Sequence, residues 1–310
     1  MDLENINGIE EPDLSAVVFS GSYEDTPDIR SLVIEEGVVE ICENAFRDFE
    51  NLHDITLPKS LLVIGPSAFS GCKNLETVRF LGGITEISDE AFSGCSSLTS
   101  VIMPDTVKRI GEGAFEGCAS LSRLRLSEST LMIGASAFAY CFNLTDVTIP
   151  DSCILVELCA FYSCFSLEAV KLSENMGIID ESTFEGCRSL KIVELPARLT
   201  KIGRRAFLGC KSLPSLILPI GLSSIGFDAF SGCSSLSRIA IPKGISEIED
   251  EDAFSGCDSL VEISYGGSRE AFDSLMRGKT LTVERSDLTV ATPRVICLDI
   301  KDKEGREVEV

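Results

Sequence analysis

The cysteines are the residues whose type and spacing most invite a chemical role. The sequence holds 13 of them. Nine recur at intervals of 23 or 24 residues: Cys72, Cys95, Cys118, Cys141, Cys164, Cys187, Cys210, Cys233 and Cys257. A zinc site needs paired ligands at a short spacing such as Cys-x-x-Cys, and the sequence contains no such pair. Isolated cysteines at a regular interval favour a ladder of buried thiols, because a free cysteine packs as a small hydrophobe. Disulfide or redox use of the same column is the alternative.

Two further features could support chemistry, and neither carries a complete motif. His53 is the single histidine, and no Ser or Cys nucleophile motif accompanies it, so we predict a solvated surface side chain. The acidic run Glu249–Asp252 lacks the spaced ligands and glycine turn of a calcium loop, which favours a solvated loop. The sequence therefore predicts no catalytic residue, no cofactor, no metal ligand and no enzymatic activity.

Charge restricts the class of partner. There are 27 Lys and Arg against 49 Asp and Glu, a net charge of −22. A surface this acidic repels phosphate backbones and anionic lipid. A membrane-spanning helix needs about 18 or more consecutive apolar residues, and the sequence has no such stretch. We therefore expect no nucleic-acid binding and no membrane insertion.

The elements that must position any site come from internal repetition. A phenylalanine, preceded by Ala in nine of ten copies, recurs at Phe46, Phe69, Phe92, Phe115, Phe138, Phe161, Phe184, Phe207, Phe230 and Phe254. Counting from each of these as position 0, position +6 is always Leu, +9 is Ile, Val or Leu, and +11 is apolar. Position +18 is Ile or Val in every full copy, from Ile64 to Ile248. The nine regular cysteines stand at +3. This period is typical of a stacked repeat protein.

Each copy predicts one coil of a solenoid. A short strand runs from about +7 to +11, a turn follows, a second extended piece ends at +18, and a tight helical turn carries Ala-Phe. Proline after +11 in six copies ends the strand, and glycine at +2 and +19 is expected where a turn needs a positive φ. Cys159 stands at +21, a column that is polar in most copies, so we expect it to be exposed. One copy buries too little to fold alone, and stacked neighbours must complete the core.

The pattern resembles the BspA-like class of bacterial leucine-rich repeats. It reads Leu-x-x-Ile-x-Leu-Pro-x-x-Leu-x-x-Ile-Gly-x-x-Ala-Phe-x-x-Cys, as in Leu190–Cys210, where Val193 stands at the first Ile position. The resemblance implies an α/β repeat solenoid that is right-handed and curved, with a parallel β-sheet on its concave face and short helical or extended turns elsewhere. Members of that class are commonly surface or secreted proteins that bind other proteins.

Both ends of the array are predicted to be caps. Val17–Phe19 can supply a covering strand, and Tyr23 takes the phenylalanine position of a half-copy. Ser268 can cap a short helix, and strand-like runs follow at Leu281–Val283 and Arg294–Ile300. Capped ends favour a monomer. The predicted domains are an N-terminal cap at 1–28, the solenoid at 29–265 and a C-terminal cap of a short helix plus strands at 266–310.

The sequence supports two different expectations for the cellular location of the protein. The first residues lack the basic start and apolar run of a secretory signal, which predicts a cytoplasmic protein with reduced thiols. The family resemblance implies a cell-surface or secreted protein whose leader is absent from this chain.

The variable positions +8 and +10 of the first strand should face outward on the concave sheet, because +9 and +11 face inward. They combine basic and apolar side chains, which suggests a protein-binding surface. The predicted partner-binding residues are Arg79, Ile102, Arg123, Arg125, Lys171, Ile192 and Ile217. We expect a non-catalytic protein-binding scaffold whose partner is a protein, through an acidic loop, or an acidic glycan. A surface adhesin or structural surface protein is the alternative, and unconstrained drift of these positions is a third explanation.

Overall fold

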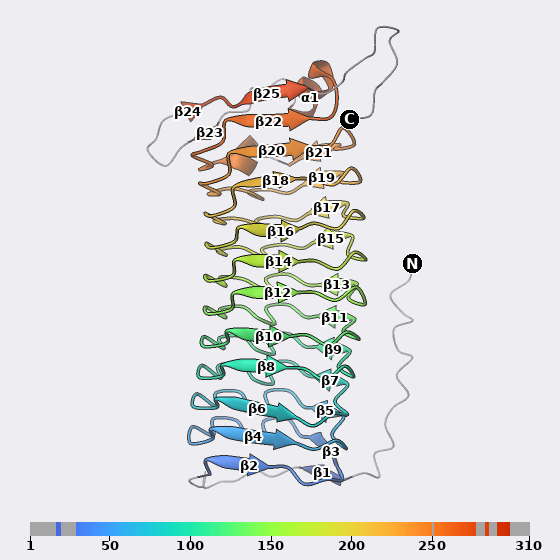
Figure 1. Ribbon diagram of the computed structural model, residues 1–310, viewed down its shortest axis with the longest axis vertical. Coiled ribbons are helices and arrows are strands. Elements are labelled where there is room, and N and C mark those ends of the chain that lie inside the picture. Colours follow the sequence, from blue (N-terminus) through green and yellow to red (C-terminus); the bar gives the residue numbers. More distant parts are fainter. Residues whose placement is uncertain (1–16, 20–28, 250, 277–282, 285–289, 298–310) are drawn as a thin grey trace.

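The chain winds into an elongated column of stacked coils, with strands on two of its faces (Figure 1). The computed structural model describes residues 17–19, 29–249, 251–276, 283–284 and 290–297. We number the coils 1 to 10 from the ten repeated phenylalanines, so that coil 4 begins at Phe115, coil 5 at Phe138 and coil 6 at Phe161.

The longer strands form one face of the column, called here the long-strand face. They are β2 (Ser31–Val33), β4 (Asp54–Leu57), β6 (Thr77–Phe80), β8 (Ser100–Ile102), β10 (Arg123–Arg125), β12 (Asp146–Thr148), β14 (Ala169–Lys171), β16 (Ile192–Glu194), β18 (Ser215–Ile217), β20 (Arg238–Ile241), β22 (Glu262–Tyr265) and β25 (Arg294–Cys297). Successive strands pair in parallel with equivalent residues opposite each other. The strands predicted between +7 and +11 are confirmed.

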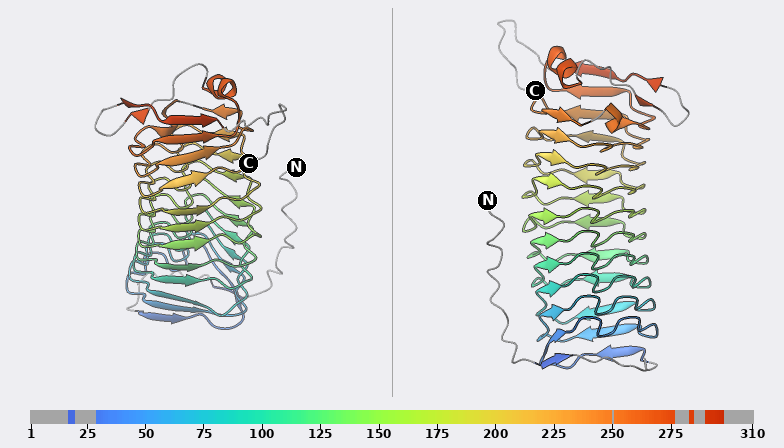
Figure 2. Two further views of the ribbon diagram at one scale, coloured as in Figure 1. Left: turned by 45° about the horizontal axis from the view of Figure 1, so that its top comes forward. Right: turned by 180° about the vertical axis from the view of Figure 1, so that it is seen from behind.

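Shorter strands that end at +18 form a second face, called here the short-strand face. They are β1 (Val17–Phe19), β3 (Val38–Ile41), β5 (Val63–Ile64), β7 (Glu86–Ile87), β9 (Arg109–Ile110), β11 (Met132–Ile133), β13 (Leu155–Val156), β15 (Ile178–Ile179), β17 (Lys201–Ile202), β19 (Ser224–Ile225) and β21 (Glu247–Ile248). They too pair in parallel. Since alternate side chains of a strand point to opposite sides, +18 is buried and +17 faces outward. Figure 2 shows both faces from further directions.

The strand ladders are interrupted at three places within the described residues. On the long-strand face they break between β10 and β12 and between β16 and β18, and on the short-strand face between β13 and β15. Pro214 accounts for the second break. Its counterpart one coil earlier, Lys191, donates its backbone N–H to the Glu168 carbonyl at 2.8 Å, and proline has no N–H to donate. No proline explains the other two breaks.

A continuous stack of phenylalanine rings fills the core. The ten repeated rings are fully buried. Neighbouring rings lie 5.1 to 5.7 Å apart between centroids and within 17° of parallel. The +6 leucines and +18 isoleucines or valines are buried beside them. The predicted internal phenylalanine column is confirmed, and it makes the coils one cooperative stack.

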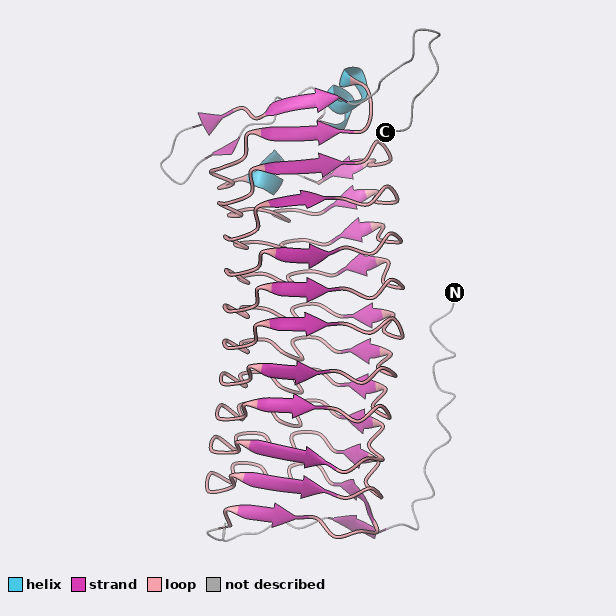
Figure 3. Cartoon of the chain, viewed as in Figure 1, coloured by secondary structure: helices cyan, strands magenta, loops and turns pink. Residues whose placement is uncertain are grey.

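The predicted helical turn around Ala-Phe is an irregular turn in nine of the ten coils, and only in coil 10 do Ala253 and Phe254 lie in a short 3₁₀ helix. The described residues contain one α-helix, α1 (Arg269–Leu275), and one 3₁₀ turn, η2 (Glu251–Phe254), so the protein is a parallel β-solenoid with almost no helix (Figure 3). Left-handed residues on both sides of the phenylalanine end the turn, for example Asn44 (φ 56°) and Asp48 (φ 58°). The Phe46 N–H donates instead to the Ala68 carbonyl of the next coil at 2.7 Å. Handedness and curvature stay predictions.

The two glycine columns have different causes. At +2 the prediction of a positive φ is confirmed, as for Gly94 (φ 71°). At +19 it is wrong, since Gly65 and Gly226 do not have a positive φ. A Cβ at either position would lie 2.6 Å from backbone of the preceding coil, so close approach between coils selects glycine there. The other left-handed position is +21, which holds Cys159 (φ 57°).

The described parts of both ends agree with capping. β1 pairs with β3, and β25 extends the long-strand face beside β22. Ser268 caps α1, since its hydroxyl accepts the Ala271 N–H at 3.2 Å. β23 (Val283–Glu284) pairs antiparallel with β24 (Val290–Ala291). Tyr23, the start of the 281–283 run and the end of the 294–300 run lie outside the described residues, and the domain boundaries stay a prediction.

Candidate binding surface

The residues predicted to bind a partner face outward from the long-strand face. The side chain of Ile217 is 79% exposed, that of Ile192 59% and that of Ile102 44%. The four basic side chains are exposed as well: Arg79, Arg123, Arg125 and Lys171. The +9 residues between them point inward and are buried or half-buried, as the alternation of side chains along a strand requires. A binding role for these seven residues stays a prediction.

The basic side chains form a spaced row. Arg79, Arg125 and Lys171 occupy +10 on β6, β10 and β14, which are alternate strands. At about 4.8 Å per strand, neighbours in this row lie roughly 10 Å apart. Ile102 lies between the two arginines and is in register with Arg125. Because about 10 Å is the screening length at 0.1 M salt, the cations repel each other weakly.

Acidic side chains near this row neutralise part of its positive charge. Arg125 Nη2 lies 3.6 Å from Asp105 Oδ1, with both side chains about 60% exposed (59% and 61%), so the pair contributes little stability. Lys171 lies in register beside Glu194. Within the described residues, Arg79 and Arg123 have no ion pair. These two arginines are therefore the basic groups most open to a partner.

An exposed aromatic cluster beside the turns was missed by the sequence prediction. Phe142 and Phe165 stack at 4.9 Å and 15°, and Tyr140 meets Tyr162 edge-on at 5.3 Å. The guanidinium of Arg188 covers Phe165 at 4.4 Å. Tyr140 has φ 60° at +2, where seven other copies have glycine. Aromatic residues at positions that are glycine or polar in most other copies were the signal that could have identified the cluster.

The thiol ladder is confirmed as buried and unpaired. All nine +3 cysteines are fully buried, and none is in a disulfide. Each thiol donates a hydrogen bond of 3.1 to 3.4 Å to the carbonyl of the phenylalanine one coil earlier. Burial raises the pKa of the Cys164 thiol to about 12. The Cys164 thiol is therefore protonated and unreactive at neutral pH.

Other predicted positions have structural partners. Cys159 is half-buried, so the prediction that it is exposed is wrong, and burial followed by the charge of Glu185 raises its pKa. His53 is also half-buried, with Nδ1 2.7 Å from the Asn51 carbonyl. In the acidic run, the carboxylate of Glu249 accepts the Phe227 N–H at 3.1 Å. These contacts support folding and assemble no reactive group.

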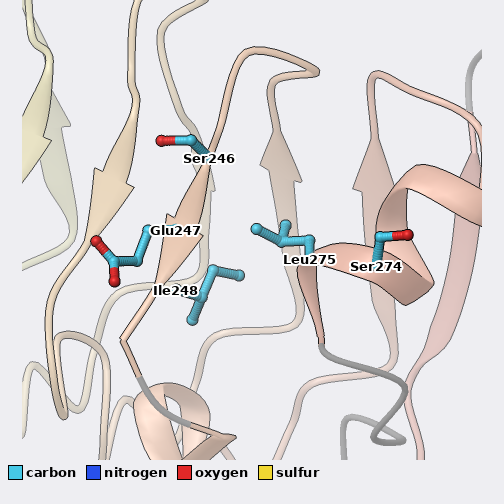
Figure 4. A pocket seen from close by; sticks show the side chains of 5 residues that line it. All are labelled: Ser246, Glu247, Ile248, Ser274 and Leu275. Atoms are coloured by element: carbon cyan, nitrogen blue, oxygen red, sulfur yellow. The ribbon is translucent and has the colours of Figure 1, made fainter.

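A hollow lies between β21 and α1 (Figure 4). It is lined by Ser246, Glu247, Ile248, Ser274 and Leu275. Both hydroxyls donate to backbone carbonyls, Ser246 to Ser223 at 2.9 Å and Ser274 to Glu270 at 2.8 Å. In the described part of the chain, no three His, Cys, Asp or Glu side chains are grouped as metal ligands. No described helix is long and apolar enough to span a bilayer.

Solved structures of bacterial leucine-rich-repeat proteins resemble this chain. The pneumococcal vaccine antigen PcpA is 21% identical, with a TM-score of 0.54 over 87% of this chain and 77% of PcpA. A leucine-rich repeat protein from Bacteroides ovatus is 26% identical, with a TM-score of 0.47 over 87% of this chain and 84% of its own. The T. pallidum leucine-rich repeat protein is 30% identical, with a TM-score of 0.46 over 60% of this chain and 79% of its own.

The match to a family model settles the relationship. No curated protein matches the chain. The model of the BspA type leucine-rich repeat region, with 6 copies, matches residues 17–141 and 156–275, well over half of the sequence. The 23-residue coils, the phenylalanine stack and the paired strand faces are the structural form of that repeat. The chain belongs to the BspA type leucine-rich repeat family.

Proposed function

We propose that this protein is a non-catalytic scaffold that binds another protein through its long-strand face, the face expected to be concave. Leucine-rich-repeat families generally serve as interaction or surface scaffolds, and they are typically non-catalytic. The observation that carries the proposal is the exposure of Ile102, Ile192 and Ile217 on the same face as exposed basic side chains. Apolar groups with a charged margin are the usual composition of a protein interface.

The chemistry of the partner follows from the open arginines. Arg79 and Arg123 have no ion pair with a described residue, and the rest of the chain is strongly acidic. An acidic loop of a protein therefore fits this face, with apolar side chains that cover the isoleucines. An acidic glycan satisfies the arginines but leaves the isoleucines uncovered, so a protein is the preferred partner.

The test places a photo-crosslinking residue at Ile192 and, as a control, at Lys211 in a turn. Crosslinking in extracts of the native host should capture a discrete partner from position 192 and not from 211.

Once the partner is identified, its association rate can be measured with charge variants. Arg79→Glu/Arg123→Glu should slow association by about tenfold at low salt, and the effect should shrink as salt rises. Lys59→Glu/Lys211→Glu makes the same change in charge and should leave association almost unchanged. Equal loss in both variants would remove the long-strand face from the proposal.

A surface adhesin or structural surface protein remains the alternative, and family resemblance alone supports it. Protease treatment of intact host cells separates the two locations. Degradation of the native protein on whole cells would favour the surface alternative, whereas protection until lysis would favour the cytoplasm.

A further inference from the structure

A second exposed apolar surface lies on the short-strand face. It consists of Leu131, Met132, Ile154, Leu155 and Ile178, called here the apolar patch. Four of these side chains are between 36% and 59% exposed, and Met132 is half-buried. Apolar patches of about 300–600 Å² are the largest that typical monomers expose, and they are often functional.

The patch is contiguous and confined to coils 4 to 6. Met132 and Leu155 are in register on β11 and β13, and the Ile154 N–H donates to the Leu131 carbonyl at 3.0 Å. Ile178 follows on β15, across the interrupted ladder. A Cβ at Gly177 would meet no atom within 4 Å, so the surface is open there. The same two positions in nearby coils are polar: Thr85 and Glu86, Lys108 and Arg109, Thr200 and Lys201, Ser223 and Ser224, Ser246 and Glu247.

Carboxylates flank the patch along both of its sides. Three precede it at the corner shared with the long-strand face, one in each coil: Glu128, Asp151 and Glu174. Three follow it at the next corner: Glu157, Asp180 and Glu181. None of the six has a Lys or Arg partner among the described residues. Arg109, at one end of the patch, is by contrast neutralised by Glu86 at 2.7 Å and Asp89 at 3.0 Å.

We propose that the apolar patch binds an amphipathic helix of another protein, with Lys or Arg along both edges of its apolar side. Coils 4 to 6 span two strand spacings, about 10 Å, which is the length of about two helical turns. A helix that lies along the column would place its apolar side on the patch and its basic edges beside the two rows of carboxylates. Charge complementarity selects this occupant, because a second copy of the chain or an anionic membrane would bring like charges together. The inference does not depend on the long-strand face.

A synthetic peptide can test the proposal directly. The probe is a fluorescent 14-residue peptide of Leu and Lys at helical spacing, and its binding to the full chain is followed by anisotropy at 150 mM salt. We expect a dissociation constant in the micromolar range. Ile154→Ser/Ile178→Ser should weaken binding at least tenfold. Glu128→Gln/Glu174→Gln should weaken it three- to fivefold and flatten its salt dependence. The control Ile192→Ser/Ile217→Ser makes the same chemical change on the other face and should leave affinity unchanged.

Three outcomes would overturn the proposal. A peptide of the same composition in scrambled order could bind equally well, which would mean that charge alone attracts it. The Ile154→Ser/Ile178→Ser variant could bind the peptide as the unaltered chain does, provided that its melting temperature shows it is folded. Sedimentation could reveal a dimer of the unaltered chain that this variant loses, which would make a second copy the occupant.

Discussion

The thiol of Cys164 donates a hydrogen bond to the carbonyl oxygen of Phe138, one coil earlier, across 3.2 Å. The same bond joins every successive pair of coils from Cys72 to Cys257. A thiolate cannot donate this bond, and burial disfavours its charge as well. The repeat therefore uses cysteine as a small hydrophobe that also satisfies a backbone carbonyl.

Alkaline pH should unfold the column. The ordinary thiol pKa is 9.0, and burial raises the pKa of Cys164 to about 12. A raised pKa means that the folded state holds protons that the unfolded state releases, so stability is intact below pH 9 and falls above it. Burial raises the pKa of seven ladder thiols, from Cys95 to Cys233, and each of them costs about 1.4 kcal/mol per pH unit in that window. Together they cost on the order of 10 kcal/mol at pH 10, comparable with the stability of a whole domain.

Urea unfolding followed by circular dichroism between pH 8 and 11 measures this fall. Cys118→Ala/Cys187→Ala should make it shallower, while Cys42→Ala, which changes a half-buried cysteine outside the ladder, should leave it nearly unchanged. A midpoint that stays constant up to pH 11 would contradict protonated ladder thiols.

Native thiol labelling should divide the cysteines into two groups. Cys42, Cys159 and Cys297 are half-buried and should react at pH 8. Cys42 and Cys159 should react more slowly than a free thiol, because burial raises the pKa of each. The nine ladder cysteines and Cys153, whose pKa burial raises to about 11, should react only after denaturation. Mass spectrometry of peptides counts the labels, and rapid native labelling of Cys118 would disprove the assignment.

Truncation of a stacked ring should be costly. Phe138 is fully buried between Phe115 and Phe161 at 5.3 and 5.5 Å, so Phe138→Ala should lower the free energy of unfolding by about 3–5 kcal/mol. Phe227 is 38% exposed and lies under Arg204, so Phe227→Ala is the control and should cost about 1 kcal/mol or less. Urea titration at pH 7 compares the two, and equal losses would contradict the core assignment.

Two glycine substitutions should have opposite effects. Gly94 has φ 71°, so Gly94→Ala should destabilise the fold by about 1–2 kcal/mol. Gly177 lies outside the left-handed region, and a Cβ added there would meet open space. Gly177→Ala should therefore stabilise the fold by about 0.4–1 kcal/mol, because alanine lowers the conformational entropy of the unfolded chain. Thermal melting distinguishes them, and a destabilised Gly177→Ala variant would be the contrary result.

Periodicity in the sequence was sufficient to predict the coil, because each buried column depends on residue type alone. Phe138, Leu144 and Ile133 are apolar at positions that are apolar in every copy, and all three are buried. The left-handed +21 column could not be predicted in this way. Ser67 and Cys159 share no backbone preference. Backbone hydrogen bonds to the next coil impose the left-handed conformation, as when the Ser67 N–H donates to the Asp89 carbonyl at 2.9 Å.

The binding surfaces were predictable only in part. Alternation in the strands gave the outward direction of Arg79 and Ile217 correctly. The Arg125 to Asp105 pair depends on how the turn after β8 returns beside β10, which the sequence does not encode locally. The apolar patch was open to sequence analysis, since Leu131 and Ile154 are apolar where most other copies are polar, but an isolated strand of two residues gives too weak a pattern to identify its face.

The repeated hydrogen bond at the phenylalanine turns also has a genetic consequence. The N–H of Phe46, Phe115 and Phe207 donates to the alanine carbonyl of the next coil at 2.7, 2.8 and 2.9 Å. Loss or duplication of a 23-residue segment within the regular coils would therefore join a phenylalanine N–H to a carbonyl in the equivalent position. Unequal recombination within such a gene can shorten or lengthen the protein by whole coils while each intermediate still folds, so the length of the column is a trait that can evolve separately from its sequence.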